Sequence, residues 1–99
     1  MTLPIEQEFS SRGVVRGGLL LLRPTDALKM VRRAHESGLR ILGVDGFQLT
    51  DTSTQPLMQN SVDLSRVESL DSAAVRAEEL LTNQSSAGLF FEIILEPPS

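Results

Sequence analysis

Residues 24–46, PTDALKMVRRAHESGLRILGVDG, decide the fold, because they predict an amphipathic helix that leads into a buried strand. At 100° per residue, small and apolar side chains fall on one helical face and charged side chains on the other. Pro24 suits the first turn of a helix, and Gly38 suits a left-handed residue at its end. We therefore predict a surface helix, a strand over residues 39–44 and a turn at Asp45-Gly46.

Three more strands and a second helix are predicted outside this stretch. Residues 19–22 form a short apolar run between Gly17-Gly18 and Pro24, as in a buried strand. Residues 57–64 alternate modestly, with Met58, Asn60, Val62 and Leu64 on one side, and residues 89–95 form an apolar strand. The second helix has apolar or small side chains at helical spacing, namely Val67, Leu70, Ala74, Ala77 and Leu81.

The start of the second helix has two candidate positions. Ser65 and Glu68 fit a capping box, whereas Asp71 offers a later cap. The residues before Gly18 are also open to two interpretations. Ile5 to Phe9 alternates like an edge strand, with Ile5, Gln7 and Phe9 on one side, but the arm could equally be disordered.

The resulting β-α-β-β-α-β order predicts an α+β fold, a ferredoxin-like two-layer sandwich with two helices on one face of an antiparallel sheet. Ninety-nine residues make one domain, which we expect over 18–99 after an arm or extra edge strand over 1–17. The apolar first and last strands should lie side by side in the middle. Gln48, Gln59 and Asn60 suit exposure of the other two strands at the edges.

Charge is divided unevenly along the chain. Residues 1–42 hold seven Arg and Lys against four acids, whereas residues 43–99 hold two Arg against nine acids. Such an acidic surface repels nucleic acid and attracts basic partners, although it can also serve only to keep a helix soluble. The chain has no cysteine, and it has no apolar run long enough for a membrane or a signal peptide, so we expect a cytoplasmic protein.

The stretch resembles the immunity proteins of anticodon-cleaving (tRNase) E-group colicins. In that family a proline opens a helix with small inner residues, which runs through Gly-Leu into an Ile-Leu-Gly-(Ile/Val)-Asp-Gly strand. The matching residues are Pro24, Ala27, Ala34, Gly38, Leu39, Ile41, Leu42, Gly43, Val44, Asp45 and Gly46. The chain departs from the family in its N-terminal arm. The family has an aromatic-rich loop just after the Asp-Gly, where this chain has Phe47 alone.

This resemblance implies a non-enzymatic protein, without cofactor or metal, that occludes the active cleft of a basic ribonuclease toxin. Carboxylates would stand in for RNA phosphates and planar side chains for bases. The candidate toxin-binding residues are Asp45, Phe47, Gln48 and Asp51, with Asp63 and Glu92 as weaker candidates. Asp45 could instead serve only to form its turn.

Other classes of function are less well supported by the sequence. RNA binding requires exposed aromatic and basic residues on the sheet, but Phe90 and Phe91 point to opposite faces. His35, the only histidine, lies at the margin of the first helix, where a packed histidine is commoner than a general base. A ligand-binding or oligomerising ferredoxin-like domain would cover its open sheet face with a ligand or a second copy, and the chain could then be a monomer or a homodimer. A small enzyme would need a carboxylate-lined pocket at Asp45.

Overall fold

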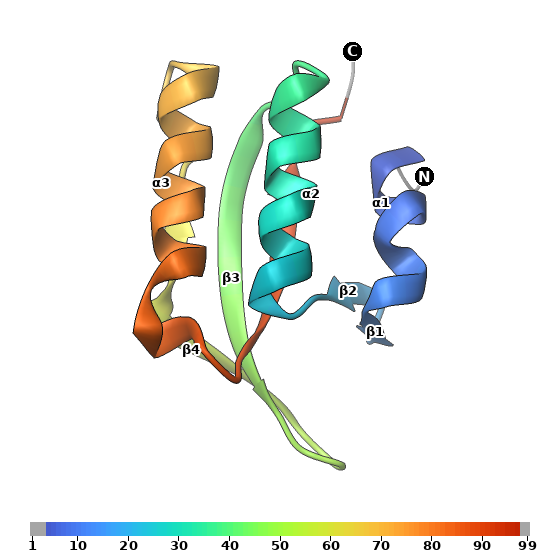
Figure 1. The fold of residues 1–99 in the computed structure, drawn as a ribbon. Helices are drawn as coiled ribbons and strands as arrows, with labels where there is room; N and C mark the ends of the chain where they lie inside the picture. The colour runs from blue at the N-terminus through green and yellow to red at the C-terminus, as the bar shows by residue number, and fades with distance from the viewer. Residues whose placement is uncertain (1–3, 98–99) are drawn as a thin grey trace.

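Two helices cover one face of an antiparallel sheet in the computed structural model, which describes residues 4–97 (Figure 1). The helices are α2 (Pro24–Glu36) and α3 (Leu70–Thr82), and the sheet has the order β4 (Thr54–Asp63), β3 (Ile41–Leu49), β5 (Phe90–Leu95). A second sheet is the hairpin of β1 (Val14–Arg16) and β2 (Leu19–Leu21). The α+β sandwich with its β-α-β-β-α-β order is therefore confirmed, and an additional strand, β1, precedes it.

The order of the strands corrects one expectation. The first and last strands are neighbours, because Leu22 and Phe91 form an antiparallel bridge with hydrogen bonds of 2.8 and 2.7 Å. However, β3 lies in the middle of its sheet, paired with β4 on one side and β5 on the other, while β2 pairs with β1 and joins β5 only through the Leu22–Phe91 bridge. The cause is that β3 buries side chains such as Ile41 and Val44 against the helices, whereas its polar Gln48 lies at the hairpin end that projects past the helices (Figure 1).

Helix α2 forms as its sequence predicts. It begins at Pro24, and Gly38 adopts a positive φ of 74° just after its end. Of the side chains that the two helical stripes and the C-terminal strand place in the core, Val31, Ala34, Ala77 and Ile93 are buried. Val67 is only partly buried, because it precedes α3 instead of lying within it.

The N-terminal segment is a helix where an edge strand or disorder was predicted. Residues Pro4–Phe9 form α1, followed by the 3-10 turn η1 (Ser10–Arg12). Ile5 and Phe9 are four residues apart, so they share one helical face and are both buried, while Gln7 is exposed. The alternation that suggested a strand was thus accidental, because Gln7 does not share the buried side.

Helix α3 begins later than the capping box predicts and earlier than an Asp71 cap. Ser69 is the N-cap, with its side chain accepting a hydrogen bond from the Ser72 N–H at 3.1 Å. Ser65 is unavailable as a cap because its N–H and hydroxyl both donate to Asp63 Oδ1, at 2.9 and 2.6 Å. The Arg40 guanidinium also holds the loop before α3, because it donates to the carbonyl oxygens of residues 67 and 68.

Val31→Asp should unfold the protein. The Val31 side chain is fully buried between α2 and the sheet, so an aspartate there would be an unpaired charge in an apolar site. We expect the free energy of unfolding to fall by about 4 kcal/mol or more in a denaturant titration. Lys29→Asp places an aspartate at an exposed position of the same helix and should lower the free energy of unfolding far less. A Val31→Asp protein with near-wild-type stability would contradict the helix assignment.

Phe9→Ala tests whether the N-terminal helix belongs to the core. Phe9 is 5% exposed and joins the same apolar cluster as α2. Truncation of a buried phenylalanine should lower the free energy of unfolding by about 3 kcal/mol. Gln7→Ala, on the exposed side of α1, serves as the control and should change stability by less than about 0.5 kcal/mol. Equal stabilities for the two variants, measured by thermal or chemical unfolding, would show that α1 does not pack on the domain.

Candidate functional site

The Asp45-Gly46 pair lies in the middle of β3 and is not the turn that the sequence predicts. Gly46 is needed there for space: a Cβ on it would lie 2.5 Å from the Asn60 carbonyl oxygen and 3.1 Å from the Phe91 ring. A glycine that permits close approach of a neighbouring backbone resembles a turn glycine in sequence. Within residues 4–97 the Asp45 carboxylate accepts no hydrogen bond, so it does not act as a turn former.

A bulge in β4 causes this close approach. Val44 pairs with Val62 but Gly46 pairs with Leu57, so residues 58–61 of β4 stand opposite a single residue of β3. The Ser61 hydroxyl accepts a hydrogen bond from the Gly46 N–H at 3.0 Å and donates to the Leu57 carbonyl at 2.8 Å. These two bonds replace the backbone pairing that the bulge removes.

Asn60 and the short turn that follows α3 fix the bulge from the inside. Asn60 is 4% exposed, and its side-chain amide donates to the Ser85 hydroxyl at 3.1 Å and the Ser85 carbonyl at 3.4 Å. Ser85 lies in η2 (Gln84–Ser86). The sequence predicts that the Asn60 side chain is exposed on an edge strand, and this prediction of exposure is wrong. Because Asn60 turns inward, Met58 is displaced outward and is 86% exposed.

Three of the candidate carboxylates gather on the face of the sheet that carries no helix. Gly46 faces Phe91 in the core, so its neighbour Asp45 points to the other face. Glu92 of β5 stands directly opposite Asp45, and Asp63 of β4 stands opposite Gly43. We call Asp63, Asp45 and Glu92 the acidic row, which crosses three adjacent strands about 5 Å apart.

Burial and mutual repulsion change the acidity of this row. The pKa of Asp45 is raised, first by partial burial and second by the negative charge of Asp63. The pKa of Glu92 is raised by partial burial, by Asp45 and by Glu6. The exposed Asp63 behaves oppositely, since its two hydrogen bonds from Ser65 lower its pKa. The row thus concentrates negative charge where the protein itself does little to neutralise it.

The other candidate residues lie elsewhere. Phe47 shares the helix-free face but is only 8% exposed, so its ring is a structural part of that face and offers little surface for stacking. Phe90 stands opposite Phe47 and is half-buried, with the Arg23 guanidinium 4.5 Å above its ring. Gln48 is exposed near the hairpin end, and Asp51 lies in the exposed hairpin loop. The structure therefore brings Asp45, Asp63 and Glu92 together with Phe47, but not with Gln48 or Asp51.

The hairpin loop is anchored to the N-terminal hairpin. Arg16 Nη1 donates to the carbonyl oxygens of Thr50 and Ser53 at 2.7 and 3.0 Å. Thr50 and Ser53 also bond each other through backbone and side chain. The loop that carries Asp51 is therefore held in place, although it lies apart from the acidic row.

A hollow of about 260 Å³ opens beside Asp45. Its lining combines two carboxylates with apolar groups and the exposed methionine, namely Gly43, Asp45, Met58, Ser61, Asp63 and Ile94. A Cβ at Gly43 would lie 3.6 Å from Ile94 Cδ1 and 3.1 Å from the Val62 carbonyl oxygen, so glycine keeps this floor open. Flexible methionine side chains suit variable contacts at binding surfaces.

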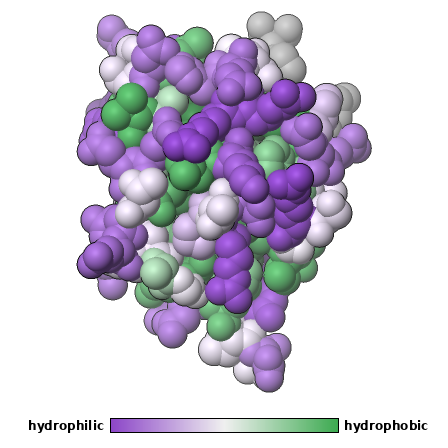
Figure 2. Space-filling model, in the orientation of Figure 1, coloured by the Kyte–Doolittle hydropathy of each residue, from purple (hydrophilic) through white to green (hydrophobic). Residues whose placement is uncertain are grey.

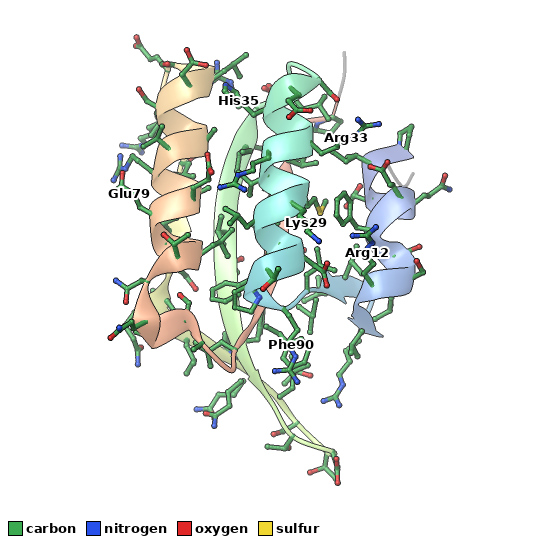
Figure 3. The ribbon with its side chains drawn as sticks, in the orientation of Figure 1. Arg12, Lys29, Arg33, His35, Glu79 and Phe90 are labelled. Carbon is green, nitrogen blue, oxygen red and sulfur yellow. The ribbon has the colours of Figure 1, made fainter. Side chains whose placement is uncertain are left out.

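The helix side of the molecule is electrically different. Figure 2, in the orientation of Figure 1, shows mostly hydrophilic residues over the helices. There Arg32 pairs with Glu78 at 2.9 Å, and Arg33 pairs with Glu8 at 3.3 Å. Figure 3 shows Arg12, Lys29 and Arg33 between α1 and α2, and Arg12 pairs with Asp26 at 3.6 Å. These arginines therefore have carboxylate partners, whereas Asp45 and Glu92 on the sheet have no ion-pair partner within residues 4–97.

His35 also belongs to the helix side. Its Nε2 lies 2.6 Å from Asp71 Oδ1 on α3, in a contact between the two helices. The half-exposed position that the sequence predicts is confirmed. This histidine lies in the helix layer and does not line the hollow at Asp45.

Within residues 4–97, no three His, Asp or Glu side chains form a group that could hold a metal ion. No helix in the same range is long and apolar enough to cross a membrane. Comparison of the sequence with protein-family models and with curated proteins finds no match.

Sequence reasoning missed Met58 and Ser61. The alternation over residues 57–64 placed Met58 on the same side as Val62, but the bulge turns it outward. Ser61 carries no signal at all, since its role depends on Gly46 standing opposite. The two glycines at positions 43 and 46 are compatible with a bulge or a close backbone approach, and the structure has both at Gly46.

The acidic row should make stability depend on pH. Because folding raises the pKa of Asp45 and Glu92, the folded protein binds more protons than the unfolded chain above their ordinary values of 3.8 and 4.5. Stability should therefore fall as the pH rises from this range through the raised pKa values. Asp45→Asn and Glu92→Gln should each raise the melting temperature at pH 7 and flatten that fall.

Glu79→Gln is the matched control, since Glu79 is exposed on the outer side of α3 (Figure 3) and should leave the pH profile unchanged. Asp63 contributes in the opposite sense, because its lowered pKa favours folding as the pH rises through its ordinary range. Melting curves between pH 3 and 8 make the measurement. An Asp45→Asn protein less stable than wild type at pH 7 would contradict a raised pKa of Asp45 in the folded protein.

Proposed function

We propose that this chain is a non-enzymatic binding protein, resembling the immunity proteins of anticodon-cleaving colicins, whose helix-free sheet face occludes the active cleft of a basic ribonuclease toxin. The observation that carries the proposal is the acidic row. Asp45 and Glu92 stand opposite each other on adjacent strands, and neither makes an ion pair within residues 4–97. A partner that supplies Lys or Arg would relieve a repulsion that the protein tolerates alone.

The geometry of the row supports RNA mimicry. A ribonuclease that holds the RNA backbone must present basic side chains to successive phosphates. The row offers negative groups on three neighbouring strands, and the hollow beside Asp45 adds an apolar wall with Met58. Apolar contact surrounded by charge is the usual composition of a protein interface.

The same face is poorly suited to bind RNA directly. Its negative charge repels phosphates, and its rings are not free for base stacking, since Phe47 is buried and Arg23 covers Phe90. A homodimer through this face is also disfavoured. Two copies related by a two-fold axis would bring the acidic row of each against the other.

A small enzyme is the second candidate, because the hollow is lined by carboxylates and the pKa of Asp45 is raised, as in many general acids. The remaining hydroxyl group in the hollow is engaged, since Ser61 bonds Gly46 and Leu57. Turnover of an activated phosphodiester such as bis(4-nitrophenyl) phosphate by the purified chain, lost in Asp45→Asn, would favour the enzyme. Absence of turnover with tight toxin binding favours the inhibitor.

The binding proposal is tested with the product of the neighbouring reading frame, if that frame encodes a small basic nuclease domain. Surface-binding kinetics should show fast association at low salt that slows steeply as salt is raised, because screening removes long-range steering. Asp45→Asn should raise the off-rate and weaken binding by about 2–5 kcal/mol, as expected for loss of a charge that pairs in a buried interface.

Glu79→Gln controls for net charge, since it removes one negative charge from the helix side. It should change the on-rate slightly and leave the off-rate unchanged. A light-scattering mass of the free chain and of the complex gives the stoichiometry. Association that does not depend on salt, or wild-type affinity in a folded Asp45→Asn protein, would overturn the proposal.

A further inference from the structure

The sheet is split between β2 and β5. Leu22 and Phe91 exchange two backbone hydrogen bonds, and continued antiparallel pairing would bring Leu20 opposite Ile93. No hydrogen bond joins Leu20 and Ile93, although both lie within the described residues, and a hollow of about 220 Å³ lies between them. A ladder thus begins and stops after one pair.

Backbone polar groups of both residues face this hollow. Phe91 directs its N–H and C=O toward β2, so Ile93, two residues along the same strand, directs its own to the same side. Leu20 lies two residues before Leu22 along the chain, so its backbone N–H and C=O also point toward β5 and away from β1. The Gly17-Gly18 turn, with φ values of 57° and 82°, supports this, because in such a two-residue hairpin Arg16 and Leu19 form the bonded pair and Leu20 does not bond β1.

The rest of the lining is apolar on one side and acidic on the other. Leu20, Met30 and Val15 supply apolar surface, while Glu92 of the acidic row and Glu6 of α1 supply carboxylates. The two carboxylates are near enough for the charge of Glu6 to act on Glu92. Carbonyl oxygens and carboxylates together make the site rich in hydrogen-bond acceptors.

We propose that this hollow, which we call the β2–β5 gap, receives one Lys or Arg side chain of a protein partner. The inference rests on the proposed function in naming the partner as a basic protein. The aliphatic stem would lie against Leu20 and Met30, and the charged head would donate to Glu92 and to the unbonded carbonyl oxygens of Leu20 and Ile93.

Two independent features therefore select the same occupant. Carboxylates exclude an anion, and unbonded backbone acceptors make a purely apolar side chain unfavourable there. The long aliphatic stem of Lys or Arg suits the apolar side chains of Leu20 and Met30. Because Glu92 also stands opposite Asp45, one basic partner surface can fill the gap and contact the acidic row at once.

The test uses single blocked amino acids and no nuclease, so its failure is separate from failure of the toxin proposal. Nα-acetyl-lysine methylamide is titrated into labelled protein, and amide chemical shifts of Leu20, Glu92 and Ile93 are followed by NMR. We expect saturable shifts at these three residues. Nα-acetyl-norleucine methylamide has a similar stem without the charge and should bind at least about tenfold more weakly.

Two pairs of variants locate the site. Val15→Phe places a ring at the gap and should abolish the lysine shifts, whereas Val14→Phe, on the neighbouring position of the same strand and outside the lining, should retain them. Glu92→Gln should weaken lysine binding on the order of tenfold, and Glu79→Gln should not change it. Dispersed amide spectra establish that each variant is folded.

Three results would overturn the inference. These are the absence of saturable shifts in the wild-type protein, equal affinity for the lysine and norleucine compounds, and lysine shifts that persist in a folded Val15→Phe protein. If the gap binds lysine but no basic nuclease binds the chain, the inference about the gap is supported and the toxin proposal is overturned.

Discussion

The close contact between Gly46 and Asn60 is the constraint on which the helix-free face depends. Because Gly46 has no side chain, the β4 backbone can pass within a distance that any Cβ would block. That passage turns Asn60 inward to Ser85, brings the Ser61 hydroxyl to the Gly46 N–H and turns Met58 outward. The hollow beside Asp45 exists because these four residues of β4 leave the regular ladder.

Charge is organised by layer in this molecule. In the helix layer, Arg32 and Arg33 of α2 pair with carboxylates of α3 and α1. The sheet layer keeps Asp45 and Glu92 together without such partners, and partial burial, followed by the negative charge of neighbouring carboxylates, raises the pKa of both. Functional surfaces often keep residues that lower the stability of the fold, even where a single substitution would raise it. The contrast between the layers is therefore stronger support for a binding role than the net charge.

The predictable parts of the fold were those with a local cause. Helix α2 follows from its stripe and from Pro24 and Gly38, and the two-layer architecture follows from the order of the elements. The N-terminal helix was not predictable from Ile5 and Phe9, because their spacing fits a strand and a helix equally well. The strand order depended on how far β3 pairs on each side, which is a property of the whole sheet.

The candidate site divides in the same way. Asp45, Asp63 and Glu92 were candidates implied by the family resemblance, but the sequence could not show that they form one row. Their proximity depends on the register of β3 with β4 and with β5, which pairs residues that are far apart in the sequence. Phe47 was chosen as a candidate toxin-binding residue because it follows Gly46. In the structure it lies within β3, and its ring is buried.

The bulge in β4 also bears on the solubility of the protein. Residues 54–62 of this edge strand carry no charged side chain, and natural edge strands without charge tend to pair with strands of other molecules. Here Pro56 removes one backbone donor, and the bulge interrupts the flat edge that a foreign strand would need. The Asn60–Ser85 contact therefore acts against aggregation as well as shaping the hollow, since release of Asn60 would straighten an uncharged edge and expose it to intermolecular β-pairing.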